Sequence, residues 1–543
     1  MFSKSFSQTK LFQLDRNQIF YPIILILTCL LYFFYTFQKY DIVPSDDYVY
    51  INTGYYLTLP LTQNYLGFFY PLFFKFIFFL SGFKNVLSTI YWTYYGLSIG
   101  SFLCLYFYLK SLGAKRPISI FIASSFLFSD YQIFLFPKIS FFCFILILFT
   151  LTLIQKKDLF TKFVWITVLC WVLGYTRPEF FVSYLLAFAV TVALFVAEKR
   201  YQQPKNFFSI ALPILLFLFG VLLLGGQPLG NRGVDAFKQH FVLNYLSWHP
   251  EVHLENRNRS EFTFFRKVFG EVNTMSDIFR ENPPLFFKHI YFNVLNYWKL
   301  STNLLYHFCF DPLLKVFSYK IKYFLMASPL LLLFLINIKT SFLVLKGLLI
   351  RYIRNNGLIT CVILLPSFVS VVLIYPREHY FLFHLVVALS VIAIVLDSLE
   401  FKRHSVVFFL KISMLVLFVM GSAMSNIETQ KKTNHDKMYE YLIQLAQRHK
   451  LSLVTNEVFS PIFFKEYIDK YQINTFKNTP NQNIDAFLKS HDTHVVYLEM
   501  KAIDPSNQVL ASFISKDYEN YGFRKISAYE KLNYLIFVKK GIE

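Results

Sequence analysis

Long apolar segments alternate with short polar ones over residues 1–425 of the chain. Segments 21–37, 207–226 and 358–375 carry no charged residue over about 20 positions, which lets an α-helix cross the ~30 Å hydrocarbon layer of a bilayer. The pattern predicts about eleven membrane-spanning helices. We place them near residues 18–38, 86–109, 117–136, 139–155, 162–176, 179–197, 207–225, 321–338, 357–375, 379–398 and 405–425.

Lysine and arginine concentrate in every second loop between these predicted helices. One such cluster lies at 110–116 and the longest at 339–354. Because cytoplasmic loops carry an excess of Lys and Arg, we expect these loops on the cytoplasmic side. An odd number of spans then places the N-terminus in the cytoplasm and the C-terminal residues outside.

Two segments between the predicted spans are too long for simple turns, and both are expected on the outer side. The first, 39–85, contains an apolar stretch at 65–81 that Pro71 and Lys75 interrupt, which favours a helix lying on the membrane surface over a spanning one. The second, 226–320, is rich in charged, amide and aromatic residues and is too polar to span. We expect function to concentrate in these two segments.

From residue 426 onward the composition changes to that of a water-soluble α/β domain, with a small open sheet flanked by helices. Residues 426–543 contain no glycine-rich phosphate-binding motif and no nucleophilic serine motif, so we assign this domain no chemistry of its own. The predicted elements are helices at 437–449, 484–489 and 508–514 and strands at 451–455, 493–499 and 532–539.

Composition agrees with a membrane location, since 55% of the 543 residues are hydrophobic and 20% are aromatic. The net charge of +20 would suggest nucleic acid in a soluble protein. Basic and acidic residues nearly balance within 426–543, however, so the excess lies among the predicted spans and we expect no nucleic-acid partner. The lysine- and phenylalanine-rich, cysteine-poor composition favours the inner membrane of a bacterium.

An acidic pair, Asp46 and Asp47, follows the first predicted span on the outer side. Two carboxylates beside a membrane surface could act as a general base or bind a divalent cation such as Mg²⁺ or Mn²⁺. No cofactor is certain from the sequence. The alternative is structural: Ser45 is a good helix cap, and carboxylates in the first turn of a helix are stabilised by its dipole.

Cations at the outer ends of predicted spans run against the orientation rule. They are Lys138, Arg177 and Arg377, the last followed by His379. An Arg fork suits a phosphate or pyrophosphate headgroup. The competing interpretation is that Arg177 and Arg377 pair with the adjacent Glu179 and Glu378.

One carboxylate, Asp130, lies inside a predicted span, where it would cost ~2.5–3.5 kcal/mol unless it were paired or faced a cavity. It is therefore a candidate for the wall of a site. The histidines of 226–320 have no regular spacing, so a metal site there is disfavoured.

The order of these features resembles the GT-C glycosyltransferases, and most closely the family 39 type, which includes protein O-mannosyltransferases and the bacterial lipid A aminoarabinose transferase. The resemblance covers the whole chain as an arrangement: a GT-C-like membrane domain at 1–425 with external loops at 39–85 and 226–320, and an extracytoplasmic α/β domain at 426–543. The residues that carry it are Ser45-Asp46-Asp47-Tyr48, Thr176-Arg177-Pro178-Glu179 and Arg377-Glu378-His379-Tyr380-Phe381.

The resemblance implies an inverting transferase that moves a sugar from a polyprenyl-phosphate donor to a lipid, glycan or protein acceptor on the outer face of the membrane. Either Asp46 or Asp47 would be the base. The donor phosphate would be held by Lys138, Arg177, Arg377 and His379. The wall of the site would be formed by Tyr48, Asp130, Glu179 and Tyr380.

Two other functions fit the same sequence. A transporter or flippase of lipid-linked glycans would show paired repeats with broken helices, and we see no repeat. A non-catalytic envelope assembly protein would use its external domain to bind a partner and would not need the acidic pair.

Overall fold

The computed structural model describes a mostly helical protein with one small sheet. The predicted spans at 321–338 and 405–425 lie outside the described residues, apart from residue 338. The described residues are 16–36, 47–57, 67–82, 86–129, 138–224, 226, 228, 232–249, 264–316, 338–399, 435–449, 452–455, 472–475, 483–500, 503, 507–527 and 534–542.

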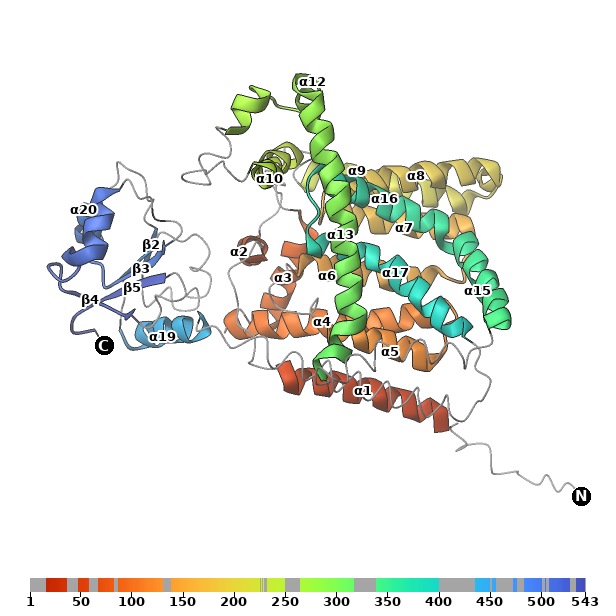
Figure 1. Cartoon of the computed structure of the whole chain (residues 1–543), viewed down its shortest axis with the longest axis horizontal. Helices are drawn as coiled ribbons and strands as arrows, with labels where there is room; N and C mark the ends of the chain where they lie inside the picture. The colour runs from red at the N-terminus through yellow and green to blue at the C-terminus, as the bar shows by residue number, and fades with distance from the viewer. Residues whose placement is uncertain are drawn as a thin grey trace, which may run out of the picture.

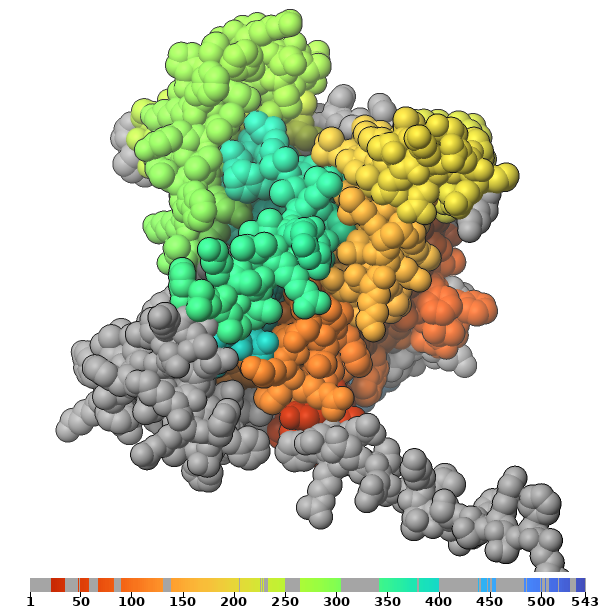
Figure 2. Space-filling model, turned by 90° about the vertical axis from the view of Figure 1, so that its right-hand side faces the viewer, coloured from red at the N-terminus to blue at the C-terminus, as the bar shows by residue number. Residues whose placement is uncertain are grey.

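Most of the predicted spans are helices that run in similar directions (Figure 1). Viewed end-on, the segments that contain them pack side by side (Figure 2). The main pairings are α4 with α5 and α6, α7 with α8, and α8 with α16. The helices at predicted spans are α1 (Arg16–Thr36), α4 (Val86–Ser111), α5 (Arg116–Leu127), α6 (Ile139–Ile154), α7 (Leu159–Gly174), α8 (Glu179–Ala197), α9 (Phe207–Leu223), α16 (Leu358–Leu373) and α17 (Glu378–Ser398), and α15 (Ile338–Tyr352) precedes α16.

Three helices within the described part of the chain are long and apolar enough to cross a membrane: Glu179–Ala197, Ser341–Leu373 and Tyr380–Ser398. This is far fewer than the eleven expected. Further apolar helices are shorter; α6, for example, has 16 residues and extends about 24 Å at ~1.5 Å per residue. The larger number of spans stays a prediction.

The interpretation of 339–354 as a basic loop is wrong. Residues 338–352 form α15, and a π-helical turn at Ile353–Gly357 joins it to α16 without a break. The lysines and arginines of this segment therefore lie on a helix. The charges of the segment suggested a loop, although its apolar residues, such as Phe342 and Ile350, are compatible with a helix.

Large apolar side chains cover much of the outside of the helical body. Phe34 on α1, Leu222 on α9 and Phe342 on α15 are each more than 60% exposed. Soluble proteins rarely expose contiguous apolar surface of this kind, whereas lipid-facing helices require it. The exposed apolar surface is therefore compatible with a membrane protein.

The first predicted external loop contains two short helices, α2 (Asp47–Tyr56) and α3 (Phe69–Leu80), and α3 coincides with the apolar helix expected at 65–81. They cross closely at Gly54, where an added Cβ would lie 2.5 Å from the carbonyl oxygen of Pro71. Glycine is needed at this crossing because a backbone oxygen cannot move aside as a flexible side chain can.

We expect Gly54→Ala to destabilise the protein by about 1–3 kcal/mol, since overpacking forces helices apart. The measurement is the midpoint of thermal unfolding in detergent. Gly96→Ala is the matched control, because a Cβ added there on α4 meets no atom within 4 Å. A Gly54→Ala protein as stable as the Gly96→Ala protein would contradict the close crossing.

The second predicted external segment forms α10 (Arg232–Trp248), α12 (Met275–Glu281) and the 34-residue α13 (Pro283–Val316). In Figure 1, α13 runs across the direction of α4, α5 and α17. It contacts α16, α5 and α17.

A buried polar network fixes α13 to the end of α16. Asn244 donates to Asn293 Oδ1 at 2.7 Å, and Asn293 donates to the carbonyl oxygen of Val372 at 2.8 Å. His289 Nε2 lies 3.0 Å from the carbonyl oxygen of Ile374. The carbonyls at the end of a helix have no partners within the helix, so this network satisfies them.

The C-terminal domain forms a five-stranded mixed sheet in the order β2-β1-β3-β5-β4. Strand β1 is parallel to both of its neighbours, β2 and β3, while β5 is antiparallel to β3 and β4. The predicted α/β character and all six predicted elements are confirmed, whereas β2 and β4 were not predicted. The elements are α19 (His435–Arg448), β1 (Ser452–Thr455), β2 (Gln472–Thr475), α20 (Ile484–Ser490), β3 (Val495–Glu499), α21 (Gln508–Ser512), β4 (Phe523–Lys525) and β5 (Tyr534–Lys539).

Candidate functional site

Asp47 is the first residue of α2 and is only 1% exposed. Its Oδ2 accepts a hydrogen bond from the hydroxyl of Tyr94 on α4 at 3.1 Å. The same oxygen accepts from the backbone N–H of Lys138, the N-cap of α6, at 2.5 Å. Three elements distant in sequence therefore meet at this carboxylate.

Lys138 is itself fully buried, and its ammonium lies 4.1 Å from the centre of the Phe141 ring. Burial raises the pKa of Asp47 to about 6, although hydrogen bonds from Lys138 and Tyr94 and the charge of Lys138 oppose the rise. Burial lowers the pKa of the Lys138 amine to about 7, against the pull of Asp47. A carboxyl group with a pKa close to neutral pH suits a general base.

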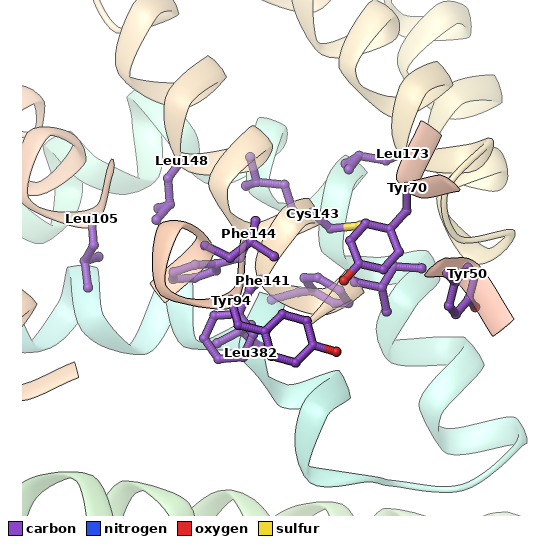
Figure 3. Close-up of a cluster of buried hydrophobic side chains, with 14 of the residues drawn as sticks. Tyr50, Tyr70, Tyr94, Leu105, Phe141, Cys143, Phe144, Leu148, Leu173 and Leu382 are labelled. Carbon is purple, nitrogen blue, oxygen red and sulfur yellow. The ribbon is translucent and has the colours of Figure 1, made fainter. Parts of the chain in front are cut away.

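Aromatic side chains lie around the Asp47 carboxylate. In Figure 3 the hydroxyls of Tyr70 and Tyr94 point into the region between the two rings, and the sulfur of Cys143 lies beside Tyr70. Tyr50, on α2 like Asp47, packs edge-on against Tyr70 with the ring centres 5.5 Å apart. The low polarity of this shell accounts for the desolvation of Asp47.

Arg177 lies in the turn between α7 and α8 and is 8% exposed. Its Nη1 donates to the hydroxyl of Ser140 at 3.0 Å, and its Nε lies 2.7 Å from Oε1 of Glu179. The guanidinium also stacks 4.4 Å from the centre of the Tyr380 ring. Arg177 is therefore paired with Glu179, as one of the two interpretations predicts, whereas its binding of a phosphate stays a prediction.

The turn that carries Arg177 is held against α3. The backbone N–H groups of Phe68 and Phe69 both donate to the carbonyl oxygen of Tyr175. Gly67 has a φ of +85°, and a Cβ there would lie 2.5 Å from the carbonyl oxygen of Thr176. Only glycine combines this backbone conformation with so close an approach.

A cavity of about 530 Å³ lies next to Arg177. Its polar wall includes Arg177, Glu179 and Tyr380. Its apolar wall comes from α8 and α16, whose lining residues Leu186 and Leu365 are 40% and 54% exposed. The cavity is therefore polar near Arg177 and apolar toward the outer surfaces of two candidate spans.

The start of α6 connects this cavity to the buried carboxylate. Lys138 holds Asp47, Ile139 lines the cavity, and Ser140 holds Arg177. Tyr50 lines the cavity one turn along α2 from Asp47. The Asp47 carboxylate and the Arg177 guanidinium are thus linked through the first residues of α6, and Tyr50 is the residue of α2 that lines the cavity.

Other predicted site residues do not line the cavity or lie outside the described residues. Arg377 is the N-cap of α17 and is not among the residues that line the cavity. Its charge, together with burial as the larger cause, lowers the pKa of His240 on α10 to about 3. Asp46 and Asp130 lie outside the described residues, as do the side chains of Tyr48 and His379.

Sequence reasoning missed Tyr50, Tyr94 and Ser140. The signal for the tyrosines was weak, since they belong to aromatic-rich segments with no distinctive spacing. Lys138 was predicted as a phosphate ligand, and this stays a prediction. Its backbone N–H bonds Asp47, and like Asp47 it is not among the residues that line the cavity.

Within the described part of the chain, no three or more His, Cys, Asp or Glu side chains are grouped in a way that could hold a metal ion. Among the histidines of 226–320, His289 belongs to the hydrogen-bond network at the end of α16. A cation bound by Asp46 and Asp47 together stays a prediction.

Comparison with known protein families gives no matching family model, and comparison with curated protein sequences gives no match.

Proposed function

We propose that this protein is a membrane glycosyltransferase of the GT-C type, which moves a sugar from a polyprenyl-phosphate donor to a lipid, glycan or protein acceptor. The observation that carries the proposal is the pairing of a buried carboxylate, Asp47, with a neighbouring cavity that Arg177 lines. The resemblance of the acidic and arginine motifs to that superfamily supports the same function.

In the proposed reaction, Asp47 takes the proton of the acceptor hydroxyl or amine as the oxygen or nitrogen of that group forms a bond to the anomeric carbon. The bond from the anomeric carbon to the phosphate oxygen breaks, and its electron pair goes to the phosphate. Arg177 stabilises the charge that develops on this leaving group. To do so, its guanidinium would shift from Glu179 toward the phosphate.

The lining of the cavity suits a lipid-linked donor. A phosphate would lie at the polar end near Arg177, and a polyprenyl chain would pass between α8 and α16 along Leu186 and Leu365. These residues are exposed on helices that could cross a membrane, so the chain would not need to leave the bilayer. We expect the site on the outer side of a bacterial inner membrane with about eleven spans, the N-terminus in the cytoplasm and the C-terminal domain outside.

Mass spectrometry of envelope lipids and glycans tests the proposal. A strain that lacks the protein should lose one sugar modification, and the wild-type gene should restore it. An unchanged set of products would reject the transferase. Flux of a lipid-linked glycan in proteoliposomes without covalent transfer would instead support a flippase, and co-purification with another envelope enzyme would support an assembly protein.

A further inference from the structure

We propose that the exposed face of α13 is a lipid-contact surface that lies in the interfacial layer of the membrane, where headgroups meet acyl chains. This inference goes beyond the proposed function, because it concerns a helix outside the site. The contact surface comprises Phe287, Tyr291, Leu295 and Trp298.

The four side chains lie on one stripe of the helix, since their spacings of four, four and three residues return to the same face. Phe287, Tyr291, Leu295 and Trp298 are 58%, 60%, 45% and 63% exposed, respectively. The opposite face contains His289 and Asn293, which are fully buried in the network at the end of α16. Packing inside the protein thus fixes which face points outward.

The composition of the stripe selects a lipid interface over water or hydrocarbon. Tryptophan and tyrosine are enriched at membrane interfaces, where an apolar ring with a polar group is favoured. Lys288 and Lys299 are also exposed and lie along one edge of the stripe. Lysines in this position reach headgroup phosphates, as in helices that lie in the membrane plane.

The direction of α13 supports the same placement. In Figure 1 it crosses the direction of α17, a candidate span, and Figure 2 shows the green segment that contains it at the edge of the helical body. A helix that runs across spanning helices lies roughly parallel to the membrane plane. The stripe therefore faces a layer at one depth along its whole length.

The experiment uses the full chain in lipid nanodiscs and measures fluorescence from Trp298, obtained as the difference between the wild type and Trp298→Phe. The phenyl ring keeps the stripe aromatic, and gel filtration checks that the variant folds. The quenchers are phosphatidylcholine with a nitroxide near the headgroup, the same lipid with the nitroxide at the chain end, and aqueous iodide. Trp165→Phe gives the matched control signal from an exposed tryptophan on α7.

We expect the nitroxide near the headgroup to remove most of the Trp298 signal, and the chain-end nitroxide to remove less. Quenching by iodide alone would place the stripe in water and overturn the proposal. Quenching by none of the three would mean that a protein partner covers it, and stronger quenching at the chain end would mean that α13 is inserted; either result also overturns it. The experiment needs no transfer activity, so its failure is distinct from failure of the proposed function.

Discussion

Replacement of Asp47 by Asn is expected to reduce sugar transfer by about 10²–10⁴-fold, the usual contribution of a general base. The amide oxygen of Asn can still accept hydrogen bonds from Tyr94 and Lys138, so the loss should come from the missing base and not from unfolding. The measurement is the rate of transfer in membrane vesicles from a strain that lacks the chromosomal copy, with protein levels matched by immunoblot.

Asp397→Asn is the matched control for this substitution. Asp397 pairs with Lys115 at 3.5 Å, with the lysine side chain 62% and the aspartate 14% exposed, and neither residue lines the cavity. Transfer should therefore continue at the wild-type rate. If Asp47→Asn were as active as Asp397→Asn, Asp47 would not be the base.

The second large effect is expected at Arg177. Arg177→Lys keeps a positive charge but removes the planar fork, so we expect transfer to fall by about 10²–10³-fold. The measurement is the same vesicle assay at saturating and limiting donor. Loss of a group that stabilises the leaving phosphate should lower the maximal rate.

Glu179→Gln separates this role from a purely structural one. If Arg177 only anchors the turn through Glu179, the glutamine variant should lose activity and stability as much as Arg177→Lys does. If Arg177 binds the phosphate, the glutamine variant frees the guanidinium and should keep most of the transfer. Equal losses in both variants would contradict the proposed role of Arg177.

Most of the long apolar helices and three of the five strands of the C-terminal sheet were predictable because hydrophobic periodicity is local. Apolar runs such as 207–225 became α9 almost residue for residue, since nothing nearby competes with a long apolar helix. The prediction for segment 339–354 was wrong because its charges suggested a loop, whereas its apolar residues continue the helix into α16. The short strands β2 and β4 were not predicted because three or four residues are too few to show a hydrophobic alternation.

The candidate site was only partly predictable, because its residues come from helices far apart in sequence. Asp47 and Arg177 stand out by charge in apolar surroundings, so sequence alone pointed to them. Their connection depends on a backbone N–H of Lys138 and the hydroxyl of Ser140, and neither leaves a signal in the sequence. Arg377 could not be separated from Arg177 by pattern, yet only Arg177 lines the cavity.

The pH dependence of transfer tests the role of Asp47 most directly. A base works only when deprotonated, and burial raises the pKa of Asp47 to about 6. The rate at limiting substrate should therefore be constant at higher pH and fall about tenfold per pH unit below that value. A rate that stays constant through this pKa in the wild type, or a decline that persists unchanged in the residual activity of Asp47→Asn, would contradict the account.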